Sequence, residues 1–220
     1  MSPPGELAAI LPRATASTWV SIRDVVPSGA YLGGGTAIAV HLQHRVSRDL
    51  DFFLREPVHL ERLVELLQEK GRLVVQQLQS EPGRQTLNIL FGTTRVQFLE
   101  ASSVRVLEPL RPVAGVMVAG LGDLLAMKLK VICDRGELRD YYDLLVIERR
   151  GHRRVEEGIA LALEKYRPRA GPAFAQSIVR GLAYLDDVQE DPGIPMAKVE
   201  VADYWERRVP EIVQSLSRYG

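Results

Sequence analysis

The sequence lacks the features that mark secreted, membrane-spanning and zinc-finger proteins. Its 220 residues include a single cysteine, Cys133, which excludes an internal disulfide bond and any zinc site built from several cysteines. No apolar run approaches the ~18 residues of a membrane span, and the N-terminal segment lacks the basic-then-apolar order of a secretory signal. We therefore expect a cytoplasmic protein that does not associate with a membrane.

Net charge is absent as well. The 28 Lys and Arg residues balance the 28 Asp and Glu residues, which argues against a protein that binds nucleic acid with its whole surface and leaves open a local basic patch. The arginines of one such cluster are Arg149, Arg150, Arg153 and Arg154. Its two interpretations are an RNA-binding surface and an ordinary solvated helix turn.

The pattern of apolar residues changes along the chain. Before about residue 120 it predicts a mixed set of elements. Strands are expected at 30–32, 48–53, 72–79, 85–91 and 94–99, and helices within 5–26 and at 36–44 and 58–70. Later helices are expected at 121–133, 137–149, 154–166, 172–185 and 201–217. This order predicts an α+β fold, with an α/β domain over 1–118 and a helical domain over 119–220.

The most informative segment is YLGGGTAIAVHLQHRVSRDLDFF, residues 31–53. A strand ends in three glycines, and a helix is expected to begin at or just after Thr36. Glycine lets a ligand approach the backbone closely, and a helix N-terminus offers unpaired N–H groups to a phosphate. A plain glycine-rich turn is the alternative. The Walker A pattern fails because position 35 is not lysine, and the dinucleotide-binding pattern fails because position 38 is neither Gly nor Ala.

Two aspartates follow this turn. Asp49 and Asp51 stand two residues apart in a run with strand character, so both carboxylates point to one face while Leu50 and Phe52 point to the other. Two such charges ~6 Å apart repel by about 3 kcal/mol at an effective dielectric of 20. A bridging divalent cation removes this repulsion, and oxygen-only ligands suit Mg²⁺. The alternative is an exposed strand with two solvated acids.

A lysine interrupts the apolar pattern of the first helix after residue 120. Only five lysines stand against 23 arginines, and Lys128 lies at helical spacing from apolar residues, where it needs an acidic partner or an anionic ligand. Asp140 and Asp143 follow one turn apart on the next expected helix. These residues form either a structural ion-pair network or part of a site.

The glycine turn and the Asp-x-Asp pair resemble the nucleotidyltransferase superfamily, whose signature is Gly-(Gly/Ser), a short spacer and Asp-x-Asp. Here twelve residues, 37–48, separate Gly35-Thr36 from Asp49. With the later MKLK and LRDYYDL segments, the sequence resembles the AbiEii toxin family, the toxin halves of abortive-infection and toxin–antitoxin pairs. The resemblance runs from about Tyr31 to about Ile147.

The resemblance implies a minimal nucleotidyltransferase sheet, followed by a helical region that completes the active site. It also implies Mg²⁺, an NTP substrate, a cognate antitoxin and an acceptor, which for some relatives is the 3′ end of tRNA. The residues it would place at phosphates are Gly34, Gly35, Thr36 and Ser47. Asp49 and Asp51 would hold the metal. Lys128 would neutralise the triphosphate, and Asp143, or else Asp140, would act near the acceptor as base or positioning group.

One departure from the superfamily pattern concerns the metal. Most members supply a third carboxylate from a later strand, whereas the expected strand at 94–99 has no acid at its alternating positions and Glu100 stands at its end. Either Glu100 or a helical aspartate substitutes, or the metal site is weakened. The alternative function is therefore a catalytically weakened nucleotide- or protein-binding module of a toxin–antitoxin system.

Overall fold

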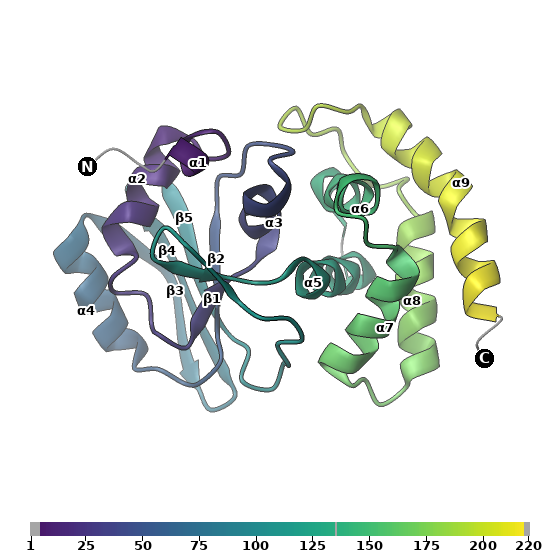
Figure 1. Cartoon of the computed structure of the whole chain (residues 1–220). Coiled ribbons are helices and arrows are strands. Elements are labelled where there is room, and N and C mark those ends of the chain that lie inside the picture. Colours follow the sequence, from purple (N-terminus) through teal and green to yellow (C-terminus); the bar gives the residue numbers. More distant parts are fainter. Residues whose placement is uncertain (1–4, 135, 218–220) are drawn as a thin grey trace. The chain divides into compact units, whose positions relative to one another are not determined.

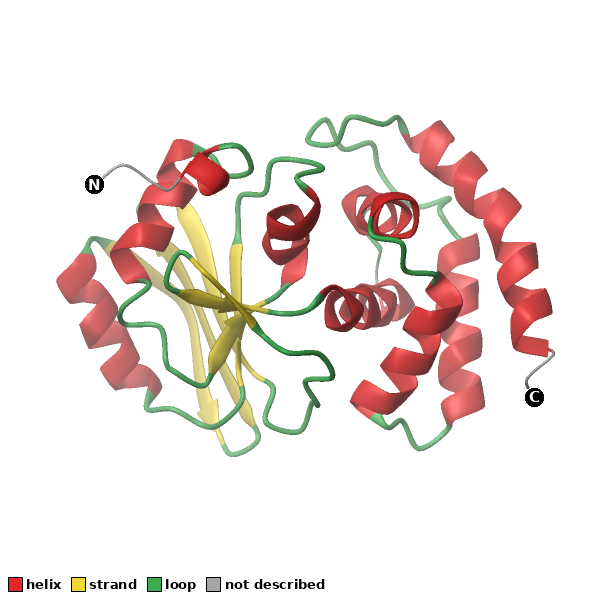
Figure 2. Cartoon of the chain, viewed as in Figure 1, coloured by secondary structure: helices red, strands yellow, loops and turns green. Residues whose placement is uncertain are grey.

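The computed structural model describes residues 5–134 and 136–217. The chain divides into two compact units between Gly120 and Leu121. The first unit combines a sheet with helices and the second is helical (Figure 2). The α+β class expected from the sequence is therefore confirmed.

The first unit is built on a mixed seven-stranded sheet. Its strands are β1 (Ala30–Leu32), β2 (Leu50–Leu54), β3 (Leu73–Glu81), β4 (Arg84–Phe91), β5 (Thr94–Glu100), β6 (Arg111–Val113) and β7 (Val116–Val118). They lie in the order β3-β4-β5-β2-β1-β7-β6. The pairs β2–β5 and β1–β7 are parallel and the other neighbours are antiparallel. The strand that contains Asp51, β2, is thus an interior strand between β1 and β5.

The two faces of this sheet differ in burial. On β2, Leu50, Phe52 and Leu54 are at most 1% exposed, while Asp51 and Phe53 are partly exposed. The helices of this unit are α1 (Gly5–Ala8), α2 (Arg13–Ile22), α3 (Gly34–Leu42) and α4 (Leu60–Lys70), and α2 and α4 cover the buried face (Figure 1). Burial of alternate residues fixes the register of β2, because a slip of one residue would bury the aspartates.

The hairpin of β6 and β7 was not expected from the sequence. Ala114 and Gly115 form its turn, with φ angles of 45° and 87°, as in the two-residue turns that suit hairpins. β7 pairs with β1 through Leu32 and Val118. Strands of three residues are too short to show a period of two. Because β7 pairs with β1, β1 is not an edge strand. The glycine turn that follows β1 therefore lies within the sheet rather than at its edge.

All regular elements among the described residues of the second unit are helices. Its helices are α5 (Leu121–Asp134), α6 (Leu138–Arg150), α7 (Val155–Tyr166), α8 (Gly171–Ala183) and α9 (Lys198–Ser217). α5 packs against α6, α7 and α8. A Cβ atom at Gly158 of α7 would lie 2.5 Å from Cγ of Leu125, so glycine is needed where α7 approaches α5. Among the described residues, no helix is both long and apolar enough to span a bilayer.

A buried tyrosine makes this unit sensitive to alkaline pH. The Tyr141 hydroxyl lies 3.0 Å from the carbonyl oxygens of Gly181 and Tyr184, and burial raises its pKa to about 12. The protonated form is therefore favoured in the folded state. This contribution to stability is complete below pH ~10, the unfolded pKa, and is lost as the pH rises toward 12.

We expect the free energy of unfolding to fall more steeply between pH 10 and 12 in the unmodified protein than in Tyr141→Phe, which has no hydroxyl to titrate. Urea titrations followed by tryptophan fluorescence at several pH values measure both slopes. Equal slopes would contradict the role assigned to Tyr141.

Candidate functional site

The glycine turn joins β1 directly to a helix. Gly33 follows β1, and its amide donates to the Asp51 carbonyl oxygen at 2.9 Å. α3 begins at Gly34, two residues earlier than the start expected at Thr36, because Gly34 adopts a φ of +64° that side chains other than glycine rarely take. The amides of residues 34–36 are therefore first-turn groups, which have no acceptor within the helix.

The Asp51 carboxylate lies against this turn. A Cβ atom built on Gly34 would lie 2.3 Å from Oδ2 of Asp51, so the space that a side chain would fill is taken by the carboxylate. Asp49 precedes β2 and is partly exposed, like Asp51. The acidic pair thus adjoins the N-terminus of α3, with no packed core between them.

Thr36 and Ser47, which the resemblance places at phosphates, have hydroxyls engaged within the first unit. The two residues are 1% and 6% exposed. Thr36 Oγ1 lies 2.8 Å from Ser47 Oγ and donates to the Asp49 carbonyl oxygen at 2.5 Å. Both side chains point into the protein and hold the start of α3 against the residues before β2, so only the Thr36 backbone amide remains for a phosphate.

Thr36→Val is expected to slow any reaction that needs the turn and the aspartates together. It keeps the shape of the side chain and removes the hydroxyl that holds them, and small misplacements of reacting groups lower rates by about 10²-fold. The rate of product formation measures the effect. The matched control is Thr93→Val in an exposed turn. A normal rate in Thr36→Val would show that the hydroxyl is not needed for positioning.

The donor set of this site fits a hard divalent cation. Carboxylate oxygens are the ligands that Mg²⁺ prefers, and the glycine cradle leaves the Asp51 carboxylate close to the backbone. Among the described residues, no group of three or more His, Cys, Asp or Glu side chains could hold a metal ion. Within the described residues of the first unit, Asp49 and Asp51 would therefore be the carboxylates that hold a cation.

Glu100 does not supply the third carboxylate. It pairs in register with Leu54, on the face of the sheet opposite to Asp51. Its oxygens accept bonds from the Gln85 amide at 3.0 Å and the Ser102 hydroxyl at 2.6 Å. Glu100 is therefore engaged at the end of β5 instead of facing the aspartate pair.

The second unit contains a separate charged cluster. Lys128 Nζ lies 2.5 Å from Asp140 Oδ1 and 3.0 Å from Asp143 Oδ2. Lys128 is 8% exposed and Asp143 is fully buried. Asp140 also accepts the Glu137 backbone amide at 2.9 Å and so caps α6. The structure brings together the three residues singled out in the sequence, as an ion-pair cluster.

These features match a known family. A family model described as nucleotidyl transferase AbiEii toxin, type IV TA system, matches residues 24–218. The chain belongs to the AbiEii family. It is accordingly a nucleotidyltransferase of a toxin–antitoxin family, as the glycine turn and the Asp-x-Asp pair had indicated.

Individual relatives of this AbiEii-family chain are distant. An uncharacterized protein of Aquifex aeolicus (strain VF5) is 28% identical over 193 residues, covering 84% of this chain and 88% of that protein. The crystal structure of JHP933 from Helicobacter pylori matches with a TM-score of 0.57 and 15% identity over 99% of this chain and 96% of that one. A second H. pylori crystal structure matches with a TM-score of 0.55 and 16% identity over 93% of each chain. At these identities the solved structures support the fold alone.

The arginine cluster of this AbiEii-family chain is largely paired. Arg153 forms an ion pair with Glu157, and Arg154 with Glu156 at 3.2 Å. The Arg149 guanidinium lies 4.7 Å from the centre of the Tyr204 ring. The cluster is therefore less positive than its sequence suggests.

The sequence analysis missed one buried ion pair. Lys165 of α7 is 1% exposed and lies 2.5 Å from Asp123 of α5, which is fully buried. Lys128 was singled out as a rare lysine at helical spacing from apolar residues. Lys165 shows the same signal, because it is one of the five lysines and stands three residues after Ala162. The pair connects two helices of the second unit.

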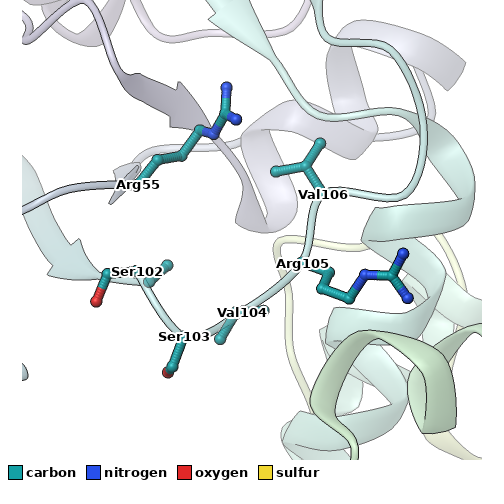
Figure 3. Close-up of a pocket in the computed structure, with 7 residues that line it drawn as sticks. Arg55, Ser102, Ser103, Val104, Arg105 and Val106 are labelled. Atoms are coloured by element: carbon teal, nitrogen blue, oxygen red, sulfur yellow. The ribbon is translucent and has the colours of Figure 1, made fainter.

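A cavity in the first unit is separate from the aspartates. Its volume is about 260 Å³, and it is lined by Arg55, which follows β2, and by residues 101–106, which follow β5 (Figure 3). Arg55 stands four residues after Asp51 along an extended strand, about 13 Å away at ~3.3 Å per residue. This cavity therefore belongs to the other end of β2.

Proposed function

We propose that this AbiEii-family nucleotidyltransferase transfers a nucleotide from an NTP to the 3′ end of tRNA with the help of Mg²⁺, as a toxin whose action a cognate antitoxin opposes. The observation that carries the proposal is the position of the Asp51 carboxylate against Gly34, at the first turn of α3. Cation ligands and phosphate-binding amides thus adjoin one another, which is what a metal-bound triphosphate requires.

The chemistry assigned to the first unit is positioning and charge neutralisation. Asp49 and Asp51 would hold the cation, which supplies positive charge to the triphosphate. The amides of residues 34–36 would bind a phosphate at the positive end of α3. The acceptor hydroxyl attacks the α-phosphorus, the bond to the bridging oxygen breaks, and pyrophosphate leaves. Such transfer needs little covalent chemistry from the protein.

Lys128 and Asp143 are assigned to the same reaction as residues of the helical unit. Lys128 would neutralise triphosphate charge, and Asp143 would position the acceptor hydroxyl or accept its proton. The resemblance carries this assignment; the ion pair at 3.0 Å fixes the two side chains against each other, as in a structural ion-pair network. The buried position of Asp143 excludes bulk water from its carboxylate.

The assignment of tRNA as the acceptor rests on the charge of the arginine cluster as well as on the resemblance to the family. An RNA phosphate would compete with Glu157 for Arg153 and with the largely buried Glu156 for Arg154, and it would also meet Arg149 and Arg150. Binding through these residues depends on salt, because each phosphate contact releases counterions. Arg153→Glu is accordingly expected to weaken tRNA binding and to reduce its salt dependence.

The experiment is incubation of the protein with each of four α-³²P-labelled NTPs, Mg²⁺ and total RNA, followed by denaturing electrophoresis. Label on tRNA supports the proposal, and loss of label after periodate treatment of the RNA identifies its 3′ end. Label on a protein or a small molecule overturns the tRNA assignment. Nucleotide binding without transfer overturns the catalytic proposal in favour of a binding module.

A further inference from the structure

The strand next to the aspartates places an amide side chain beside them. β2 and β5 are parallel, and Gln97 stands directly opposite Asp51 in register. Paired residues on neighbouring strands share a face of the sheet, at a strand separation of ~4.8 Å. We propose that the Gln97 side-chain carbonyl is a further ligand of the cation held by Asp49 and Asp51. This inference rests on the proposed function, since it concerns the same cation.

The residue on the other side of Gln97 gives a reason for its orientation. Asn88 of β4 pairs in register with Gln97, and its Nδ2 donates to Gln77 Oε1 at 2.8 Å. Its Oδ1 is buried and has no hydrogen-bond partner. A buried acceptor without a donor is uncommon and requires an explanation. Gln97 stands in register between Asn88 and Asp51, so a rotamer that lets its Nε2 group donate to this acceptor would turn its carbonyl oxygen toward the cation.

The chemistry of an amide suits this position. Side-chain carbonyls of Asn and Gln are oxygen ligands for hard divalent cations, alongside carboxylates. A neutral third ligand leaves two negative charges at the site, which balance one divalent cation. A third carboxylate would leave an excess of negative charge when the site is empty. Gln97 thus completes a single-cation site where the sequence provides only two acids.

Two other oxygen-bearing side chains of the sheet, those of Glu100 and Gln77, do not meet this geometry. Glu100 lies on the opposite face and at the end of β5. Gln77 shares the face of Gln97 but stands on β3, three strands from β2, about 14 Å away at ~4.8 Å per strand. Gln77 is therefore a matched control: the same amide on the same face, too far away to touch the cation.

The test is Mn²⁺ binding to the full chain without nucleotide, measured by the electron paramagnetic resonance signal of the free ion. Gln97→Leu is expected to weaken Mn²⁺ binding by about tenfold, and Gln97→Glu to tighten it by at least about tenfold, because each tenfold step is ~1.4 kcal/mol of ligand energy. Gln77→Glu is expected to change binding by less than about twofold. If Gln97→Glu and Gln77→Glu tightened Mn²⁺ binding equally, the effect would come from the added negative charge alone, and the inference would be overturned.

Asp51→Asn separates this inference from the proposed function. Loss of Mn²⁺ binding in Asp51→Asn, together with unchanged binding in both Gln97 variants, overturns the role of Gln97 alone. Unchanged binding in all three overturns the cation site itself. Circular dichroism confirms folding, and if Gln97→Leu does not fold, Gln97→Asn replaces it. The shorter amide of Gln97→Asn is expected to weaken binding, and wild-type affinity there overturns direct ligation.

Discussion

Asp51→Asn is expected to lower the rate of nucleotide transfer by about 10³-fold or more, which corresponds to about 4 kcal/mol of transition-state stabilisation. The substitution preserves the shape of the side chain and removes the charge that would hold the cation. The backbone carbonyl of Asp51, which accepts the Gly33 amide at 2.9 Å, is unchanged, so β2 and the glycine turn stay in place. The initial rate of label transfer at saturating NTP measures the loss.

The control for this substitution is Asp24→Asn in the same unit. Asp24 is exposed and its carboxylate bonds Lys70 at 2.7 Å, so its loss removes one surface ion pair worth about 1 kcal/mol or less. The control is expected to transfer nucleotide at the normal rate. If Asp51→Asn retained a normal rate while circular dichroism showed a native fold, the assignment of Asp51 as a cation ligand would be wrong.

The part of the site in the first unit could be predicted because it is local in sequence. Glycine turn, helix and aspartates follow one another within residues 31–53, and the period of two places Asp49 and Asp51 on one face without knowledge of the remaining fold. The direction of the Thr36 hydroxyl could not be predicted, because it depends on groups eleven and thirteen residues away. It donates to the Asp49 carbonyl oxygen and lies 2.8 Å from Ser47 Oγ.

Long-range pairing limits prediction from sequence in other parts of the chain. The position of Gln97 beside Asp51 requires the parallel register of β2 and β5, which two short apolar runs do not specify. The β6–β7 hairpin was not predicted, because strands of three residues are too short to show the alternation of apolar and polar residues that marks a strand. The sequence singled out Lys128, Asp140 and Asp143 as an ion-pair network or part of a site, whereas their ion pairs at 2.5 and 3.0 Å depend on the packing of α5 against α6.

Lys165→Met is expected to lower the free energy of unfolding by about 3–5 kcal/mol. The Lys165 and Asp123 side chains are 0% and 1% exposed and lie 2.5 Å apart. Removal of the lysine leaves the aspartate buried without its opposite charge, and burial of an isolated carboxylate is far more unfavourable than burial of the pair. Urea unfolding at neutral pH measures the loss.

The double variant Asp123→Leu with Lys165→Met distinguishes the loss of the buried ion pair from a loss of packing. Replacement of both charges by apolar side chains of similar volume is often neutral or stabilising, so the double variant is expected to unfold within about 2 kcal/mol of the unmodified protein. A double variant as unstable as the sum of the single changes would assign the effect to packing. Asp123 and Lys128 both lie on α5. If the double variant is stable, the Lys128 cluster can be tested in a folded protein that lacks the Asp123–Lys165 ion pair.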